Sequence, residues 1–224
     1  MYDLEEQEKI DALKGWWKEN RNQVVMAALA GLVLYAGITG WKSWKASQAD
    51  QAANQFLTFQ QASTAAQGDP LKIQAAARTL ETASPHSPFA SRAALMAAVA
   101  LANADKKAEA QVELQWVVDH ASEAELVSLA RIRLAGLLAD QQKYDPALAL
   151  LATGVDAGFA TLAGDRRGDI LLAQGKVVEA RAAYRSALET AEGSSPLKAG
   201  LQTKVDALGG DTPAPKAAAA EGSK

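Results

Sequence analysis

Few residues in this 224-residue chain have the types and spacing that catalysis or metal binding requires. The chain has two histidines, His86 in a Ser/Pro-containing loop and His120 near the end of an expected helix, and it has no cysteine. Asp165 and Asp169 are one helical turn apart, but a solvated helix face is a simpler interpretation of this pair than acid/base chemistry. No serine-nucleophile or phosphate-binding motif occurs. We therefore predict no enzyme, and no catalytic residue, metal site or cofactor.

The elements that position these residues are expected to be helices. Ala, Leu, Gln, Glu and Lys, which favour helices, dominate the C-terminal part of the sequence, and strand patterns are nearly missing. The formal net charge of −3 gives no basic surface, and no aromatic residues are interleaved with lysines or arginines. These observations predict an all-α fold and argue against nucleic acid as a partner.

The clearest pattern in the sequence is a helix-turn-helix repeat. The small, large, turn, small, aromatic and small positions of a tetratricopeptide repeat are filled, in register, by Gly168, Leu171, Gly175, Ala180, Tyr184 and Ala187. Small residues let the two helices of a hairpin cross closely, and the aromatic ring fills the space against the neighbouring hairpin. Gly175 supplies the tight turn between the helices.

Earlier copies of this repeat follow at unequal intervals. One copy consists of Ala135, Leu138, Gln142, Ala147, Leu151 and Gly154, and the copy before it of Ala98, Leu101, Asp105, Ala110, Leu114 and Val117. A degraded fourth copy is expected at Ala76, Leu80 and Ala83. We predict an irregular tetratricopeptide-like helical-hairpin solenoid, with a generic alanine-rich helical bundle as the alternative.

A stack of such hairpins leaves a concave surface lined by the first helix of each pair, and this surface typically holds peptides or other proteins. Helix phase places these candidate residues on it: Arg92, Leu95, Val99, Leu129, Ile132, Asp165 and Asp169. For each single residue, core packing or a solvated face is the competing interpretation.

An uncharged apolar run from Val24 to Trp41 predicts one membrane-spanning helix. Such a run is at the lower edge of what crosses a hydrocarbon core of about 30 Å, and its extension to Trp44 supplies the margin. Indole rings settle at the two membrane interfaces, where this chain has Trp16, Trp17, Trp41 and Trp44. A buried core helix and a signal peptide cleaved after Ala49 are the alternatives.

Lysines and arginines near the span predict its orientation. Four precede it and two follow it closely: Lys9, Lys14, Lys18 and Arg21, then Lys42 and Lys45. The N-terminus is therefore expected in the cytoplasm and the rest of the chain outside, which in a Gram-negative cell is the periplasm. The span also has a small-residue face, on which another membrane helix could pack, formed by Ala27, Ala30, Gly31 and Gly37.

Breaks in the sequence suggest five parts. We expect a cytosolic segment at 1–22, the span at 23–44, a juxtamembrane helix at 45–67, the repeat domain at 68–208 and a disordered tail at 209–224. Asp69, Asp145 and Ser195 are the expected N-caps of helices that begin at or near prolines.

The layout resembles a known family. The cytosolic EEQEKIDALKGWWKENR, the span that ends in GWKSWK, the Gln/Ala-rich helix and the irregular repeats are similar to the YfgM family, the ancillary subunits of the bacterial SecYEG translocon. The resemblance covers about residues 1–208. It implies a single-pass inner-membrane protein whose periplasmic repeats lie close to the Sec channel and to a membrane-anchored, PpiD-like chaperone.

Three functions follow from this layout. The first is a non-catalytic adaptor that engages a periplasmic chaperone, emerging secretory proteins or both at the translocon. The alternative, also part of what the resemblance implies, is a membrane protein whose N-terminal segment restrains a cytosolic envelope-stress response regulator. A third is a released periplasmic repeat protein, should cleavage after Ala49 occur.

Overall fold

The computed structural model describes residues 2–66, 68–193 and 196–209, with side chains from residue 8 onward. The expected cap Ser195 and the expected tail beyond Gly209 lie outside the described residues. The regular elements of the described residues are all helices, and the expected all-α class is confirmed. Its helices are α1 Tyr2–Ala65, α2 Pro70–Ala83, α3 Pro88–Asn103, α4 Lys107–His120, α5 Ala124–Asp140, α6 Tyr144–Ala152, α7 Ala160–Ala173, α8 Val177–Thr190 and α9 Pro196–Ala207, with a short 3₁₀ helix at Ala157–Phe159.

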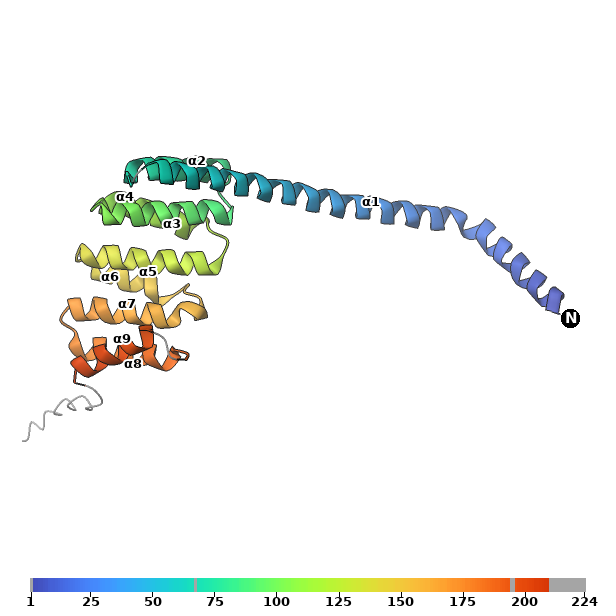
Figure 1. Ribbon diagram of the computed structural model, residues 1–224. Helices are drawn as coiled ribbons and strands as arrows, with labels where there is room; N and C mark the ends of the chain where they lie inside the picture. Colours follow the sequence, from blue (N-terminus) through green and yellow to red (C-terminus); the bar gives the residue numbers. More distant parts are fainter. Residues whose placement is uncertain (1, 67, 194–195, 210–224) are drawn as a thin grey trace, which may run out of the picture. The chain divides into compact units, whose positions relative to one another are not determined.

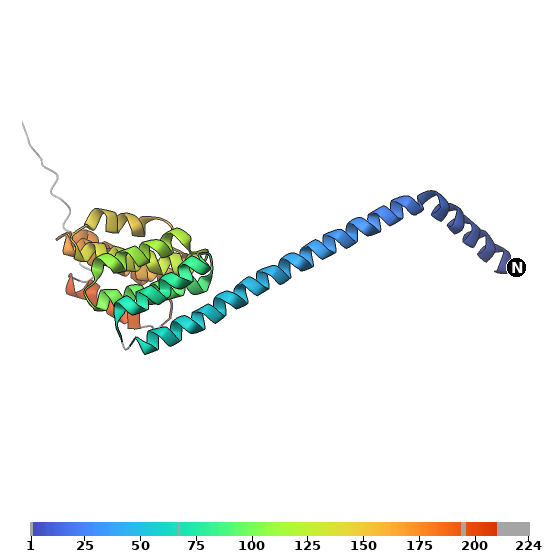
Figure 2. The ribbon, with the colours of Figure 1, turned by 90° about the horizontal axis from the view of Figure 1, so that it is seen from above.

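The chain divides into two compact units, residues 1–51 and 52–224. The first unit consists of the larger part of α1, which bends in its N-terminal region (Figure 2). Its most apolar 18-residue window has a mean hydropathy of 1.9 and is 0% buried. A helix of this length and composition can cross a membrane, and nothing within the first unit covers it.

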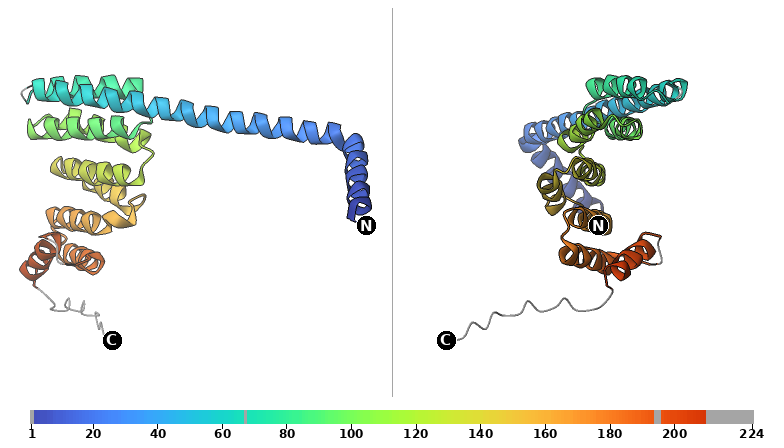
Figure 3. Two further views of the ribbon diagram at one scale, coloured as in Figure 1. Left: turned by 45° about the vertical axis from the view of Figure 1, so that its right-hand side comes forward. Right: turned by 90° about the vertical axis from the view of Figure 1, so that its left-hand side faces the viewer.

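The second unit begins inside α1, at Ala52, upstream of the expected boundary between residues 67 and 68. Phe59 in the last turns of α1 is 2% exposed and packs with Leu80 and Ala77 of α2, so the end of α1 acts as the first helix of a hairpin. The helices α2 to α9 stack in successive layers (Figures 1 and 3). This is the helical-hairpin solenoid that the repeat pattern predicted.

Turn geometry confirms the register of the three repeats. Asp105, Gln142 and Gly175 occupy the same repeat position and have φ angles of 57°, 62° and 76°, in the left-handed region. In each turn the next residue, a lysine, donates its backbone N–H to the carbonyl of a leucine five residues earlier, for example Lys176 to Leu171 at 2.9 Å. This pattern closes a helix C-terminus, and it recurs although the repeats differ in length.

Capping residues explain where several helices begin. Asp69 accepts hydrogen bonds from the backbone N–H groups of Leu71 and Lys72, with Pro70 at the first helical position, as expected. The expectation that Asp145 caps α6 is wrong, because the helix begins at Tyr144 and Asp145 lies in its first turn. Helix α6 also ends at Ala152, so Gly154 is an exposed turn residue with φ of 73° and not a packing residue.

Among the described residues of the second unit, the core consists of three clusters along the stack. The largest joins α3, α4, α5, α6 and α7 around residues such as Leu134 and Ile170. A second cluster joins the end of α1 with α2 and α3, and a third joins α7, α8 and α9 around Tyr184 and Leu201. Each hairpin therefore packs on its neighbours, and the first helices of the hairpins are held in fixed relative positions.

Candidate interaction surface

The six residues that carried the repeat pattern lie where α7 and α8 meet. Gly168, Leu171, Ala180, Tyr184 and Ala187 are all buried, and Gly175 forms the turn. A Cβ atom on Gly168 would overlap the Tyr184 ring, and one on Gly164 would lie 2.7 Å from the Ala187 Cβ. Glycine is therefore needed at both positions for the close approach of the two helices.

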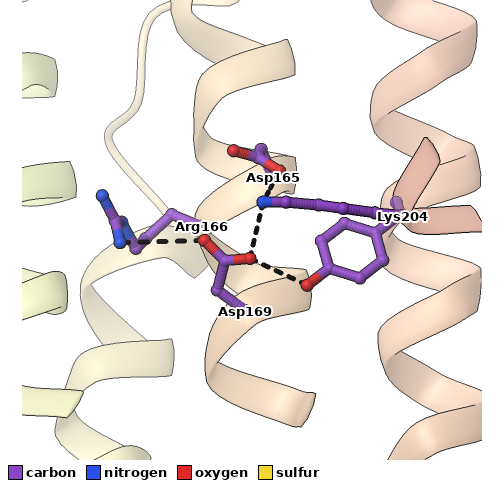
Figure 4. Close-up of polar contacts among 5 residues, drawn as sticks. Asp165, Arg166, Asp169 and Lys204 are labelled. Atoms are coloured by element: carbon purple, nitrogen blue, oxygen red, sulfur yellow. Dashed lines mark hydrogen bonds and ion pairs between the residues drawn. The ribbon is translucent and has the colours of Figure 1, made fainter. Parts of the chain in front are cut away.

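A polar cluster ties α9 to this hairpin (Figure 4). The Lys204 Nζ donates to Asp165 Oδ1 at 2.6 Å and to Asp169 Oδ1 at 2.7 Å. The Tyr184 hydroxyl donates to Asp169 Oδ1 at 2.8 Å, and Lys204 Nζ lies 5.1 Å from the centre of the Tyr184 ring. On the other side, Arg166 Nη1 is 3.7 Å from Asp169 Oδ2.

The ionisation of this cluster fits a structural role. Burial lowers the pKa of Lys204, but the hydrogen bonds to Asp165 and Asp169 outweigh it and raise the pKa overall. Burial and the hydrogen bond to Asp169 raise the pKa of Tyr184. Both groups therefore stay protonated near neutral pH and supply neither a base nor a nucleophile. The expectation that Asp165 lies on a solvated face is wrong, since its side chain is 17% exposed.

The surface best suited to a partner is a hollow on the first helices of the hairpins. It has a volume of about 570 Å³ and is formed by α3, α5 and the end of α1. We call it the α3–α5 hollow. Its apolar wall consists of Phe56, Leu95, Met96, Val99, Leu126 and Leu129, and Arg92 and Arg133 lie among them. Met96 and Val99 are 44% and 40% exposed, so large apolar side chains reach the solvent here.

The structure separates the groove candidates into three groups. Arg92, Leu95, Val99 and Leu129 line the α3–α5 hollow. Ile132 is 2% exposed within the main core, so its placement on the groove surface is wrong. Asp165 and Asp169 bind Lys204 of α9 instead of facing a groove. Helix phase alone did not distinguish these three environments.

Two arginines beside this hollow were not predicted from the sequence. Arg133 and Arg166 each lie two residues before the small residue of their repeat, Ala135 and Gly168, and so occupy equivalent positions on α5 and α7. Both line a second hollow of about 270 Å³ that continues from the first, sharing Val99 and Arg133 with it. The shared repeat position was the signal that could have revealed them.

The membrane-anchor candidates all belong to the first unit. Trp16, Trp17, Trp41 and Trp44 are between 49% and 64% exposed, and the Trp41 and Trp44 rings lie 5.3 Å apart. On the small-residue face, Ala27, Ala30, Gly31 and Gly37 are exposed, and a Cβ atom on either glycine would meet no atom within 4 Å. The role of this face as a contact for another membrane helix stays a prediction.

The histidines do not form a site in the described part of the chain. The His120 ring stacks on Trp116 with centroids 4.6 Å apart, and its Nδ1 lies 2.9 Å from the Trp116 carbonyl oxygen. His86 lies in the turn before α3. Among the described residues, no group of three or more His, Asp or Glu side chains is arranged to hold a metal ion.

Comparison with known proteins agrees with this architecture. Residues 14–210 match a family described as a tetratricopeptide repeat-like domain. A protein from Neisseria gonorrhoeae named ancillary SecYEG translocon subunit is 34% identical, over 92% of this chain and 98% of its own length. The chain belongs to the family of ancillary SecYEG translocon subunits. The ancillary SecYEG translocon subunits of Escherichia coli and Haemophilus influenzae are 26% and 25% identical over 91% and 84% of the chain.

The extent of these matches bears on both units of the structure. The match to the tetratricopeptide repeat-like family begins at residue 14, upstream of the apolar run, and ends after α9. The long N-terminal helix is therefore part of what this chain shares with the family.

Proposed function

We propose that this protein is a non-catalytic, membrane-anchored adaptor at the Sec translocon. The observation that carries the proposal is the α3–α5 hollow, an open apolar surface on a rigid stack of hairpins. Relatives that align over nearly the whole chain bear the name ancillary SecYEG translocon subunit, which supports the Sec channel as the place of action.

The anchor is the apolar part of α1, with the N-terminus in the bacterial cytoplasm and the repeat unit in the periplasm. Its support is the fully exposed apolar window, the flanking tryptophans and the excess of Lys and Arg before the span. The five parts expected from the sequence remain our proposed division, except that the last turns of α1, from Ala52, work with the repeats.

The partners of the repeat unit are proposed to be a membrane-anchored periplasmic chaperone of the PpiD-like kind, emerging secretory proteins, or both. Because the membrane anchor would hold the repeat unit beside the channel, the effective concentration of the hollow near emerging chains would be high. This gives an adaptor its effect without any chemistry.

Affinity purification of the full chain in a mild non-ionic detergent tests the proposal. We expect Sec channel subunits or a periplasmic chaperone to co-purify. Recovery of neither would contradict the adaptor function. A blot of the membrane fraction tests the anchor, because cleavage after Ala49 would release a shorter, soluble product.

A second function involves the cytosolic end of α1. Ile10, Leu13, Trp16 and Trp17 are all about half exposed or more, so this segment has apolar side chains available to a cytosolic signalling protein. Deletion of residues 2–15 separates the two functions. An adaptor keeps its translocon partners after this deletion, whereas a regulator that acts through this segment loses its effect on the envelope-stress response.

A further inference from the structure

We propose that the α3–α5 hollow and the hollow that continues from it bind an acidic amphipathic segment of a partner protein. The apolar side of that segment fills the hollow, and its carboxylates pair with Arg133 and Arg166. This inference rests on the proposed adaptor function and names the chemistry of the segment that the adaptor binds.

The first argument is the charge of the surface. Arg92 and Arg133 line the α3–α5 hollow, and no aspartate or glutamate of the described residues lines it. In the continuing hollow, the described residues join Arg133 and Arg166 with a single acid, Asp140, whose carboxylate lies 3.6 Å from the Lys107 Nζ. The surface is therefore positive, although the whole chain has a net charge of −3.

The second argument is that the guanidinium groups of Arg133 and Arg166 lack strong partners. Within residues 8–209 as the structure describes them, Arg133 makes no hydrogen bond or ion pair, and burial lowers its pKa. In the same part of the chain, Arg166 has only the 3.7 Å contact to Asp169, and its Nε is buried without a hydrogen-bond partner. Burying part of a charged group costs free energy unless a partner compensates, and a bound carboxylate would do so.

The third argument is the position of the Arg166 side chain. Its guanidinium carbon lies 3.5 Å from where a Cβ atom on Gly136 would be, so it extends from α7 to α5 of the preceding hairpin, and Gly136 is three residues after Arg133 on that helix. Two like charges that line one hollow repel each other, and an anionic side chain between them removes that repulsion. The apolar wall formed by residues such as Met96 and Val99 then requires apolar side chains beside those carboxylates.

Immobilised synthetic peptides test this inference with the full-length protein in a non-ionic detergent. Three amphipathic helical peptides share one leucine face and have glutamate, glutamine or lysine on its flanks. We expect the glutamate peptide to retain the protein about ten-fold more strongly than the other two, because a hydrogen bond to a charged group contributes about that factor. The preference should weaken as salt is added.

Arginine variants assign the preference to these residues. In Arg133→Gln/Arg166→Gln the ratio between the glutamate and glutamine peptides should fall close to one. Arg167→Gln is the matched control, since Arg167 is the neighbour of Arg166 on α7 and lines neither hollow, and it should keep the wild-type ratio. Thermal unfolding within a few degrees of wild type verifies that the variants are folded.

Three results would overturn the inference. They are a ratio near one for the wild-type protein, a ratio that Arg133→Gln/Arg166→Gln leaves unchanged, and stronger retention on an immobilised second copy of this chain than on the glutamate peptide. Sec subunits that still co-purify while the charge preference is missing would reject this inference alone. A charge preference without co-purification would instead reject the adaptor function.

Discussion

Replacement of Glu81 by glutamine should remove a pH dependence of stability that a buried carboxyl pair creates. Glu81 on α2 is 8% exposed. Burial, a hydrogen bond to Glu113 of α4 and the charge of Glu113 raise its pKa to about 8, and Arg78 opposes this only in part. Glu113 in turn accepts hydrogen bonds from the Gln74 side-chain amide at 2.6 Å and from Arg78 at 3.1 Å.

The sign of the effect follows from the direction of this pKa change. Because the folded protein holds the Glu81 proton more tightly than the unfolded chain, the contribution of Glu81 to stability is complete below the ordinary glutamate pKa of 4.5 and is lost as the pH rises toward about 8. At about 1.4 kcal/mol per pKa unit, the loss between pH 5 and pH 7.5 is on the order of 3 kcal/mol. The side-chain amide of a glutamine can still donate a hydrogen bond to Glu113, and it does not ionise in this pH range.

Urea unfolding of the full chain in a non-ionic detergent, followed by circular dichroism, measures this effect. Glu81→Gln should equal wild type near pH 5 and exceed its stability at pH 7.5. Glu189→Gln, at an exposed position on α8, should keep the wild-type dependence. An identical pH dependence in wild type and Glu81→Gln, or a less stable variant at pH 7.5, would refute the reasoning.

Four further substitutions test the packing of the repeats. Gly168→Ala should destabilise the protein by about 1–3 kcal/mol, because the new methyl group overlaps Tyr184, and a lower urea midpoint would reveal it. Gln142→Gly should raise the free energy of unfolding by about 1 kcal/mol, because glycine adopts the left-handed backbone without strain, and Gly175→Ala should lower it by about as much. Thermal midpoints equal to that of the wild type would contradict this. Lys204→Met should cost about 1–2 kcal/mol, because it leaves Asp165 and Asp169 without their ammonium partner, and it should speed hydrogen exchange in α9. Unchanged exchange would show that the polar cluster does not hold α9 on the hairpin.

Local patterns in the sequence were sufficient to predict the helices and the register of the repeats. Turn position, helix spacing and small residues depend on a few neighbours in the chain, which is why Asp105 and Gln142 could be aligned with Gly175 without their being glycines. The Asp69 cap was predicted for the same reason, since capping is a contact within one turn.

Contacts between hairpins could not be predicted in this way. The pairing of Lys204 with Asp165 and the pairing of Glu81 with Glu113 join residues on different helices, and both depend on the angle at which successive hairpins stack. The same angle buries Ile132 and leaves Arg133, its neighbour on α5, beside the hollow. The helical periodicity of the sequence places a residue on one face of its own helix, but the packing between hairpins determines what covers that face.

Photocrosslinking in intact cells tests the adaptor function most directly. A photoreactive residue at Met96, in the α3–α5 hollow, is compared with one at Val112, which is 55% exposed on α4 and lines neither hollow. We predict adducts of Sec channel subunits, a periplasmic chaperone or secretory chains at position 96, and far fewer at position 112. Adducts with cytosolic proteins alone, or equal adducts at both positions, would contradict the account.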